Sequence, residues 1–92
     1  MRFRRLYPGR VQARTTVCVD DVATPVTFEI ERRGRRDWRV TAERDDTVVL
    51  VTEHALDLKM AKRSAVTIAA NGLETYDDLR WVVRSEPTRC PR

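Results

Sequence analysis

The stretch VTFEIERRGRRDWRVTA, residues 26–42, decides the fold because apolar and polar residues alternate on both sides of one glycine, Gly34. Alternation with a period of two is typical of strands that bury one face. We therefore predict paired antiparallel strands at residues 26–31 and 37–43. The loop runs from Arg32 to Arg36, and Gly34 is free to adopt positive φ in it.

The same alternation predicts a register for this hairpin. Pairing Ile30 with Trp38 places apolar side chains opposite one another on the inner face. On the outer face it places Glu29 opposite Arg39. Cross-strand pairs of these two kinds each contribute about 0.2–1 kcal/mol.

Upstream of the hairpin, residues 11–19 alternate in the same way and predict a further strand, with every second residue from Val11 facing inward. Asp20-Asp21 interrupts it as a turn, and Pro25 suits the first residue of the next strand. Before this strand, residues 1–9 form a basic N-terminal segment that Pro8-Gly9 closes.

Downstream, the stretch TVVLVT at residues 47–52 is apolar on both faces, which predicts a strand that is central or covered on both sides. The apolar residues of the N-terminal segment are available to cover one face; they are Phe3, Leu6 and Tyr7. A chain of this length has little material to cover both faces, so we expect a homodimer.

Residues 57–70 change to helical periodicity, and a stripe of apolar residues predicts the face that packs on the sheet. The stripe consists of Leu58, Ala61, Ala65, Ile68 and Ala69. Asp57 or Thr52 can cap the start, and Asn71-Gly72 is a typical end. Leu56 and Met60 fall off the stripe.

The last element, residues 75–85, fits a helix or a strand. Asp77 and Asp78 would lie in the first turn of a helix and Arg84 near its end, an order that suits the helix dipole and slightly favours the helix. Alternation of Leu79, Trp81 and Val83 favours a strand instead. Residues 86–92 are expected to be a flexible tail.

These elements predict an α+β fold with one domain at residues 10–85. Its antiparallel sheet of three to four strands, a β-meander, is packed by one main helix, and a short C-terminal helix or strand follows. In element order alone, a meander followed by a helix resembles small β-sheet DNA-binding domains such as the AP2-like and recombinase arm-binding domains. That resemblance implies contact with DNA through the sheet.

Few residues suggest catalysis or metal binding. The chain has 92 residues with one histidine, His54, and two cysteines, Cys18 and Cys90. His54 and Asp57 could form a catalytic dyad, but no partnered serine or cysteine nucleophile accompanies them in the sequence. No zinc spacing, phosphate loop or nucleophile elbow is present. We predict no enzyme, no metal and no cofactor. No stretch reaches membrane-spanning length, and we expect a cytoplasmic protein with free thiols, the alternative being a Cys18–Cys90 clasp.

The basic residues are the main functional signal. The net charge is +4, and Arg supplies most of the positive charge, in three clusters. They are the tip (Arg32, Arg33, Arg35, Arg36), the N-terminal cluster (Arg2, Arg4, Arg5) and the helix cluster (Lys59, Lys62, Arg63). Converging on one face, they would form a phosphate-contacting footprint. A basic surface also suits an acidic protein partner. We therefore predict a nucleic-acid-associated or regulatory domain, the alternative being a protein-interaction module that acts through its sheet edge or residues 47–52.

Overall fold

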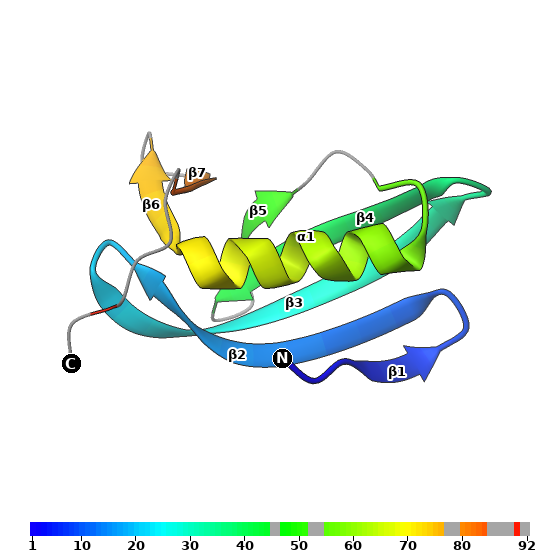
Figure 1. The fold of residues 1–92 in the computed structure, drawn as a ribbon, viewed down its shortest axis with the longest axis horizontal. Helices are drawn as coiled ribbons and strands as arrows, with labels where there is room; N and C mark the ends of the chain where they lie inside the picture. The colour runs from blue at the N-terminus through cyan, green and yellow to red at the C-terminus, as the bar shows by residue number, and fades with distance from the viewer. Residues whose placement is uncertain (45–46, 52–54, 77–79, 85–89, 91–92) are drawn as a thin grey trace.

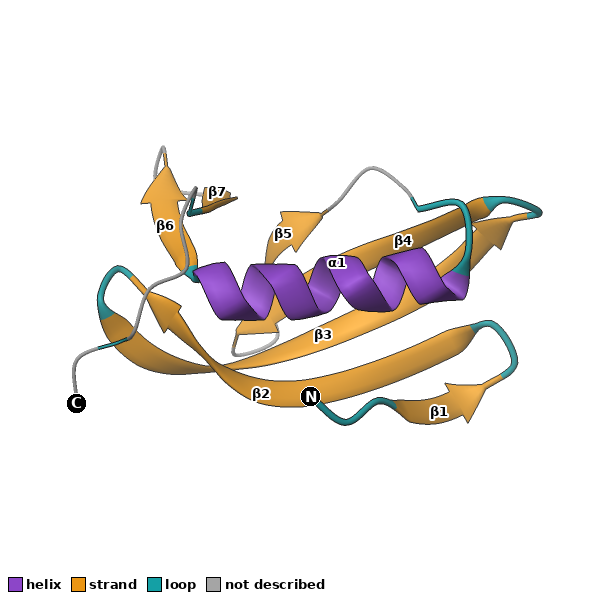
Figure 2. Ribbon diagram, viewed as in Figure 1, coloured by secondary structure: helices purple, strands orange, loops and turns teal. Residues whose placement is uncertain are grey.

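The computed structural model describes residues 1–44, 47–51, 55–76, 80–84 and 90. For residues 47–51, 75, 76, 80 and 81 it describes the backbone alone. The elements in chain order are β1 (Arg4–Tyr7), β2 (Arg10–Val19), β3 (Val22–Gly34), β4 (Asp37–Arg44), β5 (Thr47–Val51), α1 (Leu58–Asn71), β6 (Leu73–Tyr76) and β7 (Arg80–Val83). Figure 1 shows their arrangement, and Figure 2 separates helix from strand.

The described strands form one curled sheet in the order β5-β4-β3-β2-β6-β7, with β1 also paired to β2. All pairs are antiparallel except the short parallel contact of β2 with β6, at Val19 and Leu73. β1 lies along the first part of β2, and β6 continues the same edge at its far end. The end strands β5 and β7 contact each other, and α1 lies on β2, β3 and β4 (Figure 1). The sheet thus wraps around the helix.

The core lies between α1 and the inner face of the three long strands. Phe28, Ile30 and Val40 are fully buried there, and α1 contributes Ala61, Ala65 and Ile68. The predicted helix stripe is therefore confirmed at these three positions. Small side chains at a spacing of four let the helix backbone approach the sheet closely.

Both predicted ends of the helix are confirmed. The Asp57 carboxylate accepts a hydrogen bond from the Met60 N–H at 2.8 Å, which satisfies a free donor of the first turn. Gly72 follows the last turn with φ 82° and ψ 177°, a conformation that favours glycine, and its N–H donates to the Ile68 carbonyl at 2.9 Å.

The β3–β4 hairpin forms where predicted, but its predicted register is wrong by two residues. Ile30 pairs with Val40, and Trp38 pairs with Arg32. The strands run further than predicted, so that only Arg35 and Arg36 separate them, and Gly34 belongs to β3 without positive φ. A shift of two residues keeps every side chain on the same face, so alternation alone cannot fix the register.

The number of strands is larger than the predicted three to four. The N-terminal segment contributes β1. Residues 75–85, for which a helix is slightly favoured by the sequence, contain β7 and the second half of β6, which begins at Leu73. Those two strands pair with each other from Leu73 with Val83 to Tyr76 with Arg80. Pro25 is also not the first residue of its strand, because β3 begins at Val22 directly after a turn.

That turn is made by Asp20 and Asp21, both with positive φ, at 47° and 65°. Two left-handed residues between paired strands match the twist of a tight hairpin, and Asp tolerates this conformation better than most residues. The predicted turn is thus confirmed. Predictions on His54, Thr52 and Asp77-Asp78 lie outside the described residues, as does the predicted tail apart from Cys90.

Candidate nucleic-acid interface

The tip and the N-terminal cluster lie side by side. The turn at Pro8-Gly9 joins β1 to β2, and the Gly9 carbonyl accepts a hydrogen bond of 2.8 Å from the Arg32 N–H. A Cβ atom added at Gly9 would lie 3.4 Å from the Cβ of Arg32. The end of the first hairpin therefore touches the end of the β3–β4 hairpin, and the arginines of both lie at one end of the molecule.

The helix cluster joins the same end through two further contacts. The Lys62 ammonium lies 5.5 Å from the centroid of the Phe3 ring, within the range of a cation–π interaction, so α1 touches the N-terminal segment. Ahead of the helix, Ala55 and Trp38 exchange two backbone hydrogen bonds of 2.7 and 2.9 Å. These bonds hold the start of α1 beside the base of the tip.

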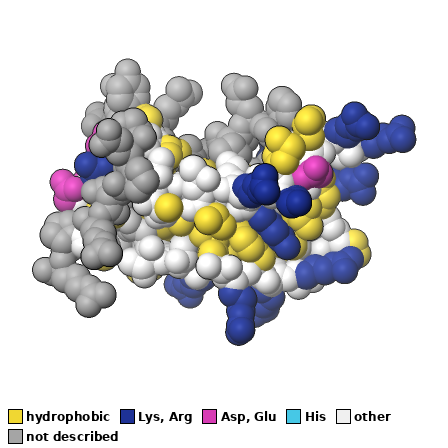
Figure 3. Space-filling view, in the orientation of Figure 1, with side chains coloured by type: hydrophobic (Ala, Val, Ile, Leu, Met, Phe, Trp, Pro, Cys, Tyr) yellow, Lys and Arg dark blue, Asp and Glu magenta, His cyan; other side chains and the backbone are white. Residues whose placement is uncertain are grey.

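We call this region the basic end. It comprises the predicted residues Arg2, Arg4, Arg5, Arg32, Arg33, Arg35, Arg36, Lys59, Lys62 and Arg63. Figure 3 shows Lys and Arg side chains gathered over the right of the molecule, where the hairpin tips and the helix start lie. Three clusters that are far apart in the sequence therefore share one surface.

Most cations of the basic end form no ion pair with a carboxylate in the part of the chain that the structure describes. Among the described residues, only Arg33 of this set forms an ion pair, with Glu31 at 3.3 Å. The Arg32 guanidinium donates to the Gly34 carbonyl at 3.2 Å, which leaves its charge uncompensated. Exposed like charges repel each other, so this arrangement costs stability unless an anion binds.

Arg10, by contrast, is part of the structure of the outer sheet face. Its guanidinium contacts the carboxylates of Glu29 at 2.6 Å and Glu31 at 3.4 Å, and it donates to the Tyr7 hydroxyl at 3.0 Å. The pKa of Arg10 is raised above its ordinary value, first by the bond to Tyr7 and then by Glu29. An arginine held by two acids offers little to a phosphate.

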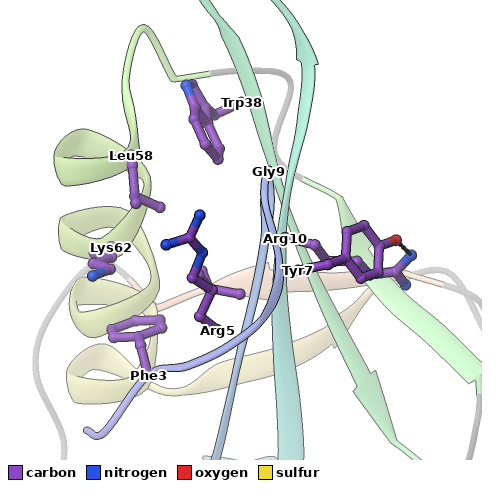
Figure 4. Close-up of a pocket in the computed structure, with 9 residues that line it drawn as sticks. Phe3, Arg5, Tyr7, Gly9, Arg10, Trp38, Leu58 and Lys62 are labelled. Carbon is purple, nitrogen blue, oxygen red and sulfur yellow. Dashed lines mark hydrogen bonds between the residues drawn. The ribbon is translucent and has the colours of Figure 1, made fainter.

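A hollow of about 370 Å³ opens between β1, the start of α1 and Trp38. Its lining includes Phe3, Arg5, Leu58 and Lys62. Figure 4 shows the Trp38 ring and the Arg5 guanidinium pointing into the space between the strands and the helix, while Tyr7 and Arg10 turn to the other side of the strands. The hollow thus combines aromatic and aliphatic walls with three cations, of which Arg10 is held by carboxylates while Arg5 and Lys62 form no ion pair with a described residue.

The sequence contains the aromatic residues of this hollow, but its pattern predicts other positions for them. Trp38 alternates in phase with Val40, which predicts a core position; it is half-buried, packs against the core and also lines the hollow. Phe3 was expected to cover residues 47–52, but β1 pairs with β2, and Phe3 lies against Lys62. The alternation of aromatic and basic residues in RFRR was the one local hint.

The opposite end of the molecule carries paired charges. Arg84 lies 2.9 Å from Asp21 and 3.3 Å from Glu74, and the bond to Asp21 is the main reason that its pKa is raised. The Asp20 N–H donates to the Leu73 carbonyl at 3.0 Å. These contacts tie the β2–β3 turn to β6 and β7.

The two cysteines also meet at this end. Cys18 is buried, Cys90 is half-buried, and both are free thiols. The pKa of the Cys90 thiol is raised to about 11, first because burial disfavours the thiolate and then because it hydrogen-bonds with Cys18. Because the thiolate is the reactive form, Cys90 is a poor nucleophile at neutral pH.

Among the described residues, no group of three His, Cys, Asp or Glu side chains could hold a metal ion. Nor does the described part contain a helix that is both long and apolar enough to cross a membrane. Comparisons with protein-family models, curated proteins and solved structures gave no match. The basic end is therefore the feature of the described residues that bears on function.

Proposed function

We propose that this domain binds nucleic acid through phosphate contacts made by its basic end. The observation that carries the proposal is the meeting of three basic clusters through the Gly9–Arg32, Lys62–Phe3 and Trp38–Ala55 contacts. Each contact brings together cations that the sequence separates by many residues. A ligand with repeated negative charges would engage all three clusters at once.

The chemistry of the cations supports phosphate as their ligand. Nearly all are arginines, whose planar guanidinium donates two parallel hydrogen bonds to a phosphate and keeps its charge at every physiological pH. Arg35 and Arg36 stand at the exposed turn of the hairpin, where they can reach a backbone without disturbing the core. Phosphate contacts of this kind position a protein without reading sequence.

A salt-dependent titration tests the proposal. Fluorescence anisotropy with labelled single-stranded and duplex DNA would give the dissociation constant at several salt concentrations. We expect affinity to fall steeply as salt rises, because bound cations release the counterions of the phosphates. In an Arg35→Ala/Arg36→Ala variant, the slope for duplex DNA should fall by about 0.9 for each lost phosphate contact.

Arg14→Ala, compared with Arg35→Ala alone as the tip variant, is the matched control for charge, since each loses one charge and Arg14 is exposed on β2 away from the tip, opposite Thr27. It should change the slope by much less than the tip variant does. A flat salt slope in the parent protein would overturn the proposal. Equal losses in the tip variant and the Arg14 control would mean that net charge, not the basic end, attracts DNA.

A protein-interaction module is the second candidate, and β5 at the end of the sheet is its observation. An end strand presents backbone groups that can pair with another chain. A homodimer through this edge is the simplest form, and sedimentation at high micromolar concentration tests it. A monomer at that concentration, together with binding to DNA, would exclude the homodimer and support the nucleic-acid proposal.

A further inference from the structure

We infer that the hollow beside Trp38 takes one unpaired nucleobase of a bound strand, with a phosphate of that nucleotide at Arg5. The inference rests on the proposed function and makes it more specific, since it implies a preference for single strands.

The walls suit a ligand that is both planar and anionic. Trp38 and Phe3 supply aromatic rings, and Leu58 completes the apolar side. Stacking of a base on an aromatic side chain is tolerant of sequence because every base has a π-face. No described carboxylate forms an ion pair with Arg5, which points into the hollow in Figure 4, so its charge is available to a phosphate.

The size of the hollow limits the ligand. A volume of about 370 Å³ lies at the lower end of the range for small-molecule sites, roughly 300–1,000 Å³, which suits one nucleotide rather than a longer segment. A base inside a duplex is stacked and paired and cannot enter such a site without being extruded. The site therefore favours a strand whose bases are already free.

The position of the hollow fits a continuous path for the strand. Gly9 lies on its lining and is hydrogen-bonded to Arg32, so the hollow opens next to the tip. Lys62 lines it on the helix side. Nucleotides on either side of the bound base would thus meet the tip and the helix cluster through their phosphates.

Arg5→Gln and Arg4→Gln form a matched pair of variants for the test. Arg5 pairs with Val11 in the sheet and Arg4 with Gln12, so the two neighbours face opposite sides of β1. Each variant removes one charge from one exposed strand. Only Arg5→Gln removes a cation from the hollow.

The experiment measures binding of single-stranded and duplex DNA of equal length, and of free deoxyadenosine monophosphate with inorganic phosphate as its control. We expect the parent to prefer the single strand. Arg5→Gln should abolish most of that preference and raise the dissociation constant of the mononucleotide by at least about tenfold. Arg4→Gln should weaken both DNA forms equally and leave the mononucleotide unchanged.

Trp38 provides a second readout. In a Trp81→Phe background Trp38 is the sole tryptophan, and stacking should change its fluorescence on addition of single strands or mononucleotide, with inorganic phosphate having no effect. Trp38→Leu should weaken single-strand binding by about 5- to 150-fold. Circular dichroism would check that this variant folds, and the Arg4/Arg5 comparison does not depend on it.

The outcomes separate this inference from the proposed function. Salt-dependent binding with equal affinity for both DNA forms and an unchanged Trp38 signal would overturn the inference and leave the proposed function standing. Mononucleotide binding that depends on Arg5, without binding of either DNA, would support the hollow as a site for a free nucleotide and overturn the proposed function. The absence of all binding would overturn both.

Discussion

The two ends of this domain treat charge in opposite ways. At the end formed by the β2–β3 turn, β6 and β7, Arg84 is held by Asp21 and Glu74, and backbone groups of separate elements bond to each other. At the basic end, among the described residues, Arg33 alone of the ten predicted cations has an acidic partner. We call the first of these the closed end.

The difference indicates which end supports the fold and which is available to a ligand. Charges that are paired within the chain stabilise the arrangement of their own elements and have little left for a ligand. Unpaired arginines around an apolar hollow contribute little to the fold and are costly without an anion. We therefore propose that the closed end supports the fold and the basic end binds, and we predict different responses to substitution.

The largest effect is expected from Gly72→Ala at the closed end. Gly72 adopts φ 82°, and an added Cβ would lie 2.8 Å from the Cys18 carbonyl oxygen, closer than such atoms approach. The backbone conformation alone costs about 1–3 kcal/mol for a residue other than glycine, and the clash adds to this. Urea denaturation would measure the loss.

Gly34→Ala is the control for that substitution at the basic end. Its Cβ would meet the Asp37 Cβ at 3.5 Å, an ordinary contact, and its φ is not positive. We expect a change within about 1 kcal/mol, of either sign. If Gly34→Ala destabilises as much as Gly72→Ala, the comparison of the two ends is wrong.

The second-largest loss of stability is expected from Ala65→Leu, because Ala65 is fully buried on the face of α1 that packs on the sheet. The larger side chain should overpack this contact at about 1–3 kcal/mol. Val66→Leu is the control on the neighbouring exposed position and should be nearly neutral. Thermal unfolding of the two variants measures the difference, and equal stability would mean that the helix face is wrongly assigned.

The Arg35→Ala/Arg36→Ala variant should keep its stability within about 0.5 kcal/mol of the parent, although it loses binding. Both residues are exposed at the hairpin turn and form no ion pair with a described residue. A slight gain is expected at low salt because repulsion among the cations falls. A clear loss of stability would show that the tip supports the fold after all.

The last expected effect concerns reactivity rather than stability, and it lies at Cys90 in the closed end. A pKa near 11 in the folded chain, against an ordinary value near 9, lowers the thiolate fraction at pH 8 about a hundredfold. Iodoacetamide should therefore modify Cys90 far more slowly in the native protein than in urea, as followed by mass spectrometry with Cys90→Ser as the control. Equal rates in the two states would contradict the raised pKa.

The same shift has a consequence for stability. Because the folded state favours the neutral thiol, the contribution of Cys90 is fully present below about pH 9 and is lost as pH rises toward 11. The stability of the parent should therefore fall over this window by more than that of Cys90→Ser.

Local chemistry in the sequence determined the helix, the strand faces and the turn at Asp20-Asp21. Asp57 caps the start of the helix that carries the apolar stripe, and Gly72 follows its last turn. Each of these signals lies within a few residues of the helix end that it marks. Alternation identified β2, β3 and β4 and the side of each that is buried. The three basic clusters were also visible, and so was each residue now placed in the basic end.

Only the tertiary structure decided the pairings between distant segments. The hairpin register moved by two residues without changing any face. Leu73–Tyr76 and Arg80–Val83 form strands because β6 meets β2 and β7, although the order of charges in residues 75–85 suited a helix. The hollow exists because Phe3 reaches the helix and Trp38 bonds with Ala55. Such contacts depend on partners dozens of residues away, and no periodicity within one segment encodes them.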